Sequence, residues 1–147
     1  MIKIVNKAFI SNDELKMFNL NNSNIGAVVT FSGYVRDFDV TQTLKLTHMT
    51  IEHYPGMTEK KLIQIEESAR IKWDLKNLLI IHRVGDINLN EKIVFIAVSS
   101  EHRDNAFDAC RYIIDYLKTE APFWKKEVSS NHSSWVQQKD SDLSKTR

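Results

Sequence analysis

The densest group of chemically capable side chains in the sequence is Ser99-Ser100-Glu101-His102-Arg103. It brings an imidazole and a guanidinium into the first turn of a predicted helix that follows an apolar strand. The free backbone N–H groups of such a turn attract anions, and the arginine adds a bidentate donor for a phosphate. A cation here opposes the helix dipole and costs stability unless an anion compensates. The alternative is a solvated turn whose two cations pair with Glu101 or Asp104.

A second group of cations lies near the end of the same predicted helix and just beyond it. Lys118 falls in the last turn, where the dipole favours a cation, so a stabilising end charge is the plainer interpretation. Lys125 and Lys126 follow two aromatic residues on a predicted strand, and successive strand residues point to opposite faces. One of these two lysines should therefore point inward, where aromatic surroundings would strip it of water and favour a base or a nucleophile.

Three further residues have the chemistry for a site, but a structural interpretation is simpler. Arg36 ends a predicted strand at the mouth of a polar loop over residues 36–43, where most arginines contact solvent. His82 ends an apolar strand beside Arg83, so we expect a buried imidazole with a satisfied hydrogen bond. Cys110, the only cysteine, falls on the apolar stripe of a predicted helix and should belong to the core. No spacing matches a zinc site, a phosphate-binding loop or a dinucleotide fingerprint.

Strands and helices alternate along the stretch that must position these residues. The pattern predicts strands over 25–35, 44–54, 78–84, 93–99 and 123–128 and around Trp135. It predicts a helix from Ser11, a second helix capped by Thr58 and a third capped by Ser99 or Ser100. The third helix has an apolar stripe, formed by Ala106, Phe107, Ala109, Cys110, Ile113, Ile114 and Leu117. From residue 44 to 128 the order is β-α-β-β-α-β, the order of ferredoxin-like folds. We therefore predict an α+β fold: one antiparallel-to-mixed sheet under two helices, an extra N-terminal helix and strand, and a small additional antiparallel element.

Length, composition and charge limit the class of protein. The 147 residues suit one domain, which we place at 1–136, followed by a polar, flexible tail over 137–147. Twenty Lys and Arg against 19 Asp and Glu give a net charge of +1, which argues against nucleic-acid binding and a basic membrane surface. The apolar stretches are far shorter than the ~20 residues of a membrane span, and the N-terminus does not read as a signal peptide. We expect a cytoplasmic protein.

Strings of residues between Gly26 and Trp135 carry a family resemblance. They are GAVVTFSGYVR (26–36), EHYPGM (52–57), HRVG (82–85), SEHR (100–103), DYLK (115–118) and APFWKKE (121–127). In this order they resemble the large, catalytic subunits of molybdopterin synthases. The fold of that family, an α/β hammerhead with an added small sheet, is compatible with the α+β prediction. Asn90 stands where the family would have glycine, and asparagine tolerates the left-handed conformation that such a turn needs.

The resemblance implies a specific activity. Family members convert cyclic pyranopterin monophosphate to molybdopterin, in molybdenum cofactor biosynthesis, by installing two sulfurs as a dithiolene. The sulfur arrives as a thiocarboxylate on the C-terminal Gly-Gly of a small ubiquitin-like subunit, whose tail enters a pocket of the large subunit. Two large subunits form a central homodimer with a small subunit at each end, a heterotetramer. The resemblance implies neither a metal nor an organic cofactor.

The resemblance also implies roles for the matched residues. Lys118 and Lys125 would be catalytic, beside the thiocarboxylate, and would contact the substrate. Arg36, His102 and Arg103 would bind its phosphate and pterin. The remaining implied binding residues are Tyr34, Val35, Lys126 and Glu127. On this reading Lys118 is a catalytic group rather than an end charge, and the substrate supplies the anion that the arginine at the helix start lacks.

Three other functions stay open on the sequence. A non-catalytic small-molecule module would use the same arginines and histidine but would not need the lysines. A persulfide sulfurtransferase would act through Cys110, against its place on an apolar stripe. An RNA-binding module is the weakest of the three, because no strand has the aromatic pattern of RNA-recognition sheets.

Overall fold

A computed structural model of the chain describes residues 1–18, 22–36, 46–129 and 133–137. Its elements are β1 (Ile2–Val5), α1 (Ser11–Phe18), β2 (Ala27–Tyr34), β3 (Leu46–His53), α2 (Met57–Lys72), β4 (Leu75–Arg83), β5 (Gly85–Asn88), β6 (Lys92–Ser100), α3 (Arg103–Glu120), β7 (Phe123–Ser129) and β8 (Ser133–Trp135). Within these ranges no helix combines the length and apolar character that a bilayer crossing needs. The loop predicted over 36–43 and the tail predicted over 137–147 lie, except for their first residues, outside the described residues.

The strands form two sheets of four strands each. In the first, with the order β1-β4-β6-β2, β1 runs parallel to β4 and the other neighbours are antiparallel. The second, with the order β5-β3-β7-β8, is antiparallel throughout. The α+β class is confirmed, but the prediction of one main sheet is wrong, because β3 and β7 pair with each other in the second sheet. The chain passes from one sheet to the other at Gly85, where β5 begins after the end of β4. Gly85 has a φ of 83°, a conformation that glycine adopts without strain.

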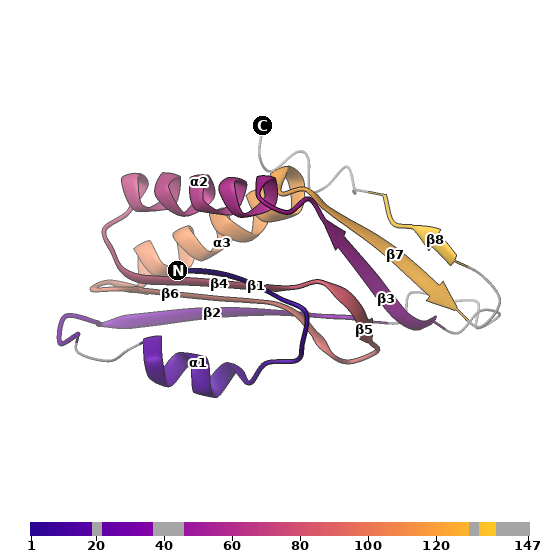
Figure 1. The fold of residues 1–147 in the computed structure, drawn as a ribbon. Coiled ribbons are helices and arrows are strands. Elements are labelled where there is room, and N and C mark those ends of the chain that lie inside the picture. The colour runs from indigo at the N-terminus through magenta and orange to yellow at the C-terminus, as the bar shows by residue number, and fades with distance from the viewer. Residues whose placement is uncertain (19–21, 37–45, 130–132, 138–147) are drawn as a thin grey trace.

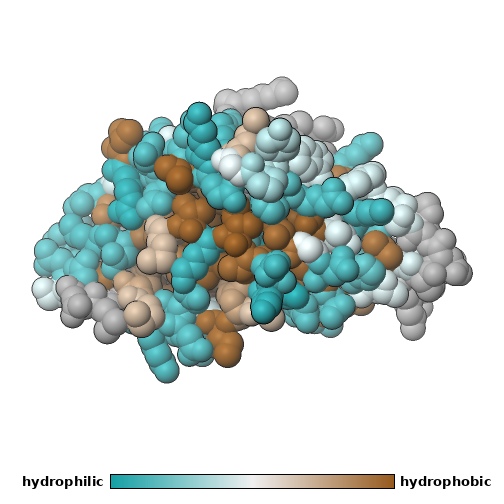
Figure 2. Space-filling view, in the orientation of Figure 1, coloured by the Kyte–Doolittle hydropathy of each residue, from teal (hydrophilic) through white to brown (hydrophobic). Residues whose placement is uncertain are grey.

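Helices cover both faces of the first sheet. Figure 1 shows α2 and α3 on one side and α1 on the other, with β3, β7 and β8 at one end of the molecule. The central strands β4 and β6 are buried on both faces, as their continuous apolar runs predict. Ile80 and Ile96 belong to the core under α2 and α3, whereas Ile81 and Phe95 belong to a smaller core with residues of α1. Apolar residues also reach the surface in the middle of the face seen in Figure 2, with hydrophilic residues around them.

The predicted cap of α2 is wrong by two positions. The helix begins after Gly56, whose backbone N–H donates to Oε2 of Glu59 at 2.6 Å. Thr58 is buried inside the first turn, where its Oγ1 accepts from the backbone N–H of Tyr54 and donates to the carbonyl of Pro122 at 3.2 Å. Thr58 thus ties the start of α2 to the segment that leads into β7.

The predicted cap of α3 is also wrong. The helix begins after His102, because Ser99 and Ser100 are buried in β6, where the Ser100 hydroxyl donates to the carbonyl of Asp74 at 2.8 Å. The apolar stripe of α3 is confirmed except at Phe107, which is 60% exposed. The stripe docks α3 on the sheet and fixes the direction in which its last turn points.

Candidate active site

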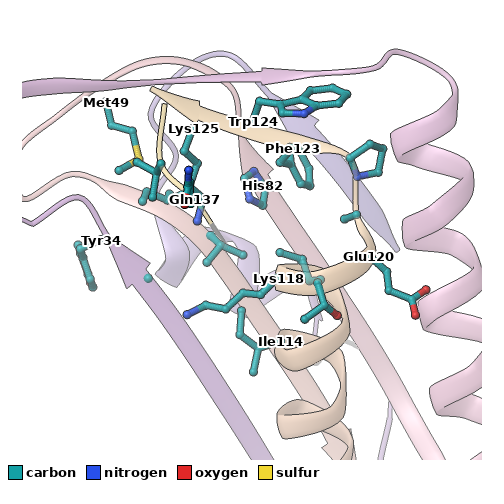
Figure 3. A pocket seen from close by; sticks show the side chains of 18 of the residues that line it. Tyr34, Met49, His82, Ile114, Lys118, Glu120, Phe123, Trp124, Lys125 and Gln137 are labelled. Atoms are coloured by element: carbon teal, nitrogen blue, oxygen red, sulfur yellow. The ribbon is translucent and has the colours of Figure 1, made fainter. Parts of the chain in front are cut away.

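A pocket of about 700 Å³ opens where the end of β2, the last turn of α3 and the start of β7 converge. Figure 3 shows side chains from these elements facing a common space. Apolar residues of β2, β6 and α3 form part of its wall, among them Phe31, Val94 and Ile114. The pocket therefore combines an apolar lining with a small set of polar groups, as ligand sites do.

The pocket gathers cations from elements that are distant in the sequence. Arg36 follows β2, Lys118 comes from the last turn of α3, and Lys125 comes from β7. Figure 3 shows Lys118 reaching in from α3 on the side opposite Lys125. The carboxylate in the described lining is Glu120, which is ion-paired to Lys61 at 2.5 Å. Positive charge thus dominates the pocket, which suits an anionic ligand.

Lys125 and its neighbour Lys126 lie on opposite faces of β7, as strand alternation predicts. Lys125 is paired across the ladder with Ile51, which is 1% exposed, and its side chain lines the pocket. Lys126 is paired with Trp135, and its Nζ lies 5.6 Å from the centre of that ring. Neither Lys126 nor Glu127 belongs to the described lining of the pocket.

His82 is a buried member of the pocket. Its ring stacks on Phe123 with the centroids 3.7 Å apart and an angle of 11° between the planes, and Nδ1 lies 2.9 Å from the carbonyl oxygen of Arg83. Burial, with a smaller contribution from the charge of Lys125, lowers the pKa of His82 from 6.5 to about 3. The prediction of a satisfied buried histidine is confirmed. The sequence did not show that the ring also lines the pocket.

The structure does not bring His102 and Arg103 to this pocket. Both are exposed at the start of α3, and Lys118 lies in its last turn, roughly 22 Å farther along at the usual rise per residue. His102 lies 3.8 Å from Glu101, and Arg103 lies 3.9 Å from Asp104. Within one copy of the chain, these two cations have the surroundings of a solvated turn.

Two other predicted binding residues, Tyr34 and Val35, differ in whether they face the pocket. Tyr34 is exposed and lines the pocket opposite α3, next to Arg36. Val35, between them, is 1% exposed, and its backbone exchanges hydrogen bonds with Asn90 and Glu91. Val35 anchors the end of β2 in the core and lets its two neighbours face the pocket.

The single cysteine is a core residue. Cys110 is buried among the apolar residues under α3 and is not part of the described pocket lining. Burial raises the pKa of its thiol to about 11, so little thiolate exists near neutral pH. This placement argues against a persulfide mechanism.

One wall of the pocket was not expected. Trp135, Val136 and Gln137 line it, and the backbone N–H of Val136 donates to the carbonyl of Lys125 at 2.8 Å. In the sequence, the signal for this wall was limited to a short strand predicted near Trp135. This wall depends on the pairing of β8 with β7, a contact that local periodicity does not reveal.

Known proteins to which this chain is similar belong to one family. The sequence model of the family described as MoaE protein matches residues 5–120. The molybdopterin synthase catalytic subunit of Pseudomonas aeruginosa is 47% identical over 141 residues, 96% of this chain and 93% of that protein. The protein of that name from Vibrio cholerae is 50% identical over 120 residues, 82% of this chain and 79% of its own length.

A solved structure has the same fold. The molybdopterin biosynthesis MoaE protein of Burkholderia ambifaria superposes with a TM-score of 0.82 at 39% sequence identity. The match covers 99% of this chain and 97% of that one. The two-sheet arrangement described above is therefore shared with a protein of known structure.

Proposed function

The chain belongs to the MoaE protein family, and on that premise we propose that it is the catalytic subunit of a molybdopterin synthase in molybdenum cofactor biosynthesis. The finer proposal is that it is a cytoplasmic sulfurtransferase acting on cyclic pyranopterin monophosphate. One observation carries this proposal: Arg36, Lys118 and Lys125 converge on one pocket from separate parts of the chain. A site for a phosphorylated substrate and a thiocarboxylate needs such a concentration of positive charge.

The pocket has the size and charge for two anionic groups. Its volume of about 700 Å³ is within the range of small-molecule sites, with room for a compact substrate and the tip of an extended tail. Lys118 and Lys125 approach from different sides, so that they can stabilise the charge that develops as sulfur leaves the thiocarboxylate. Arg36, an exposed residue of the lining, is suited to hold the phosphate through its planar fork. Tyr34 completes this side of the pocket.

The sulfur donor in this proposal is a second protein. The relatives are named catalytic subunits, a name that itself describes one part of a larger enzyme. We propose a small ubiquitin-like subunit whose C-terminal Gly-Gly thiocarboxylate enters the pocket. Glycine at the end of the tail lets its backbone pass close to the wall formed by Trp135 and Val136.

The two cations at the start of α3 fit the same reaction through a second copy of the chain. Arg103 and Lys118 lie too far apart on α3 to share a small substrate within one copy. In a two-fold dimer, however, an exposed helix start of one copy can face the pocket of the other. We therefore propose a central homodimer in which His102 and Arg103 of one copy contact the substrate bound by its partner.

The experiment that tests this proposal compares lysine variants in a reconstituted reaction. The purified chain is mixed with a thiocarboxylated small subunit and cyclic pyranopterin monophosphate, and dithiolene formation is measured. Lys118→Ala should lower turnover by about a hundredfold or more, because it removes a preorganised charge at the reacting group. Lys60→Ala, an exposed lysine of α2, is the matched control. Near-normal turnover in Lys118→Ala, with the fold and subunit binding intact, would overturn the assignment.

A further inference from the structure

His82 is the one buried polar side chain in the described lining of the pocket. A carbonyl oxygen can only accept, so the 2.9 Å contact with Arg83 O requires the proton to be on Nδ1. In the neutral ring, Nε2 then carries a lone pair. Among the described residues, Nε2 has no hydrogen-bond partner. Stacking on Phe123 fixes the plane of the ring, and with it the direction of that lone pair.

Most of the other polar side chains of the pocket differ from His82 in what they offer a ligand. Lys118, Lys125 and Arg36 are donors and recognise negative charge. Two potential acceptors are already engaged: Glu120 is paired with Lys61, and the Thr119 hydroxyl is bonded to the carbonyl of Asp115. The Tyr34 hydroxyl and the Gln137 amide oxygen can also accept, but both side chains are exposed. His82 is buried and held in a fixed orientation, so it is the acceptor best placed for an N–H group inside the pocket, where a donor without a partner weakens binding.

We propose that Nε2 of His82 is a ligand-binding group that accepts a hydrogen bond from an N–H donor placed in the pocket. This inference rests on the proposed function, which provides two sources of that chemistry. One source is a ring N–H of the pyranopterin, and the other is a backbone N–H of the glycine tail. The cations of the pocket select for a charged ligand. His82 adds selection for a neutral hydrogen-bond donor.

The surroundings of His82 keep it an acceptor. Burial comes first among the causes that lower its pKa to about 3, and the charges of Lys125 and His53 act in the same direction. The hydrogen bond with Arg83 O opposes them but does not outweigh them. A protonated ring would donate from both nitrogens and would add a further positive charge beside Lys125. The neutral form is thus available throughout the pH range in which the subunits would be assayed.

Two amide variants separate the functional nitrogen from the structural one. In His82→Asn, the side-chain amide reaches the position of Nδ1 and can keep the bond with Arg83 O, but nothing replaces Nε2. In His82→Gln, a carbonyl oxygen can reach the position of Nε2. Dissociation constants are measured by titration calorimetry, separately for cyclic pyranopterin monophosphate and for the thiocarboxylated small subunit. The ligand whose affinity changes identifies the source of the N–H group.

The expected result is a loss of about tenfold in affinity for one ligand in His82→Asn, largely restored in His82→Gln. Equal losses in both variants, or no loss in either, would overturn the inference. A measurement on the wild-type chain covers the case of poor folding: in histidine labelled with nitrogen-15, the Nε2 resonance should shift on ligand binding as expected for an accepted hydrogen bond. An Nε2 signal that does not move would overturn the inference. If neither ligand binds the wild-type chain, the proposed function itself fails instead.

Discussion

At the scale of single residues, β7 gives two adjacent lysines opposite surroundings. Lys125 shares its face with the buried Ile51 and lines the pocket, whereas Lys126 lies over the ring of Trp135 on the other face. Strand alternation allowed this division to be predicted, but not which lysine would point inward. That choice depends on the register of β7 against β3, a contact between segments about seventy residues apart in the chain.

The first prediction uses this pair. Lys125→Ala should lower kcat/KM of the reconstituted enzyme by about a hundredfold, because it removes a charge that faces the reacting groups. Lys126→Ala should lower it by about threefold at most, since a partly exposed cation–aromatic contact contributes only modestly. Steady-state rates at several substrate concentrations test both. Comparable losses in the two variants would show that Lys126 contacts the substrate, as the family resemblance implied.

The second prediction concerns His82 and acid stability. Its pKa is about 3 in the folded chain and 6.5 as the ordinary value, so between these values the unfolded state binds the extra proton. Above pH 6.5 the group does not affect the pH dependence of stability. Below it, the free energy of unfolding should fall by up to about 1.4 kcal/mol per pH unit. Urea unfolding from pH 7 to pH 4.5 should therefore show a steeper decline for wild type than for His82→Gln. Parallel declines would contradict the neutral, buried state of His82.

At the scale of elements, periodicity was a good guide to helices and strands but not to their pairing. The buried runs of β4 and β6 formed as predicted, and so did the stripe of α3 apart from Phe107, because each records burial within its own segment. The separation of β3 and β7 into a second sheet did not follow from any such run. It depends on β5, a strand of four residues that begins at Gly85 and pairs with β3.

One turn has a particular part in positioning the site. Asn90 has a φ of 66°, and its backbone N–H donates to the carbonyl of Val35 at 2.8 Å. Glu91 binds the guanidinium of Arg83 at 2.8 Å and accepts from the backbone N–H of Val35 at 3.0 Å. The turn thus holds the end of β2, from which Tyr34 and Arg36 reach the pocket.

The third prediction follows from that conformation. Asn90→Val should lower the free energy of unfolding by about 1–3 kcal/mol, because a β-branched residue tolerates a positive φ poorly. Asn90→Gly should be neutral within about 1 kcal/mol, since glycine adopts the same conformation without strain. Chemical denaturation of the three chains measures both. Equal stability of the valine and glycine variants would show that the turn relaxes to another conformation.

At the scale of the whole molecule, α3 separates two groups of cations that the sequence placed in one site. The pocket contains Lys118, whereas His102 and Arg103 lie at the other end of the helix. Sequence analysis could identify all three as candidates, because residue type and helix position are local properties. It could not show that these residues lie at opposite ends of α3, too far apart to contact one small substrate within a single copy of the chain. The proposed homodimer resolves this separation by bringing together ends of two helices.

The fourth prediction tests sharing between copies. Lys118→Ala and Arg103→Ala should each be inactive alone, but an equal mixture refolded together should regain about a quarter of wild-type activity. About half of the dimers are then mixed, and each mixed two-fold dimer has one intact site in two. Turnover of the mixture against its separate components provides the measurement. A mixture as inactive as its parts would place Arg103 outside the partner's site.

The central claim is that sulfur passes in this pocket from a protein thiocarboxylate to a pterin. The most direct test supplies the chain with a small subunit whose thiocarboxylate contains a heavy sulfur isotope, together with cyclic pyranopterin monophosphate. Mass spectrometry of the product should find the isotope in both sulfurs of the dithiolene, and Lys118→Ala should form almost none of it. Unlabelled product, or no product from a stable complex beside an active reference enzyme, would contradict the account.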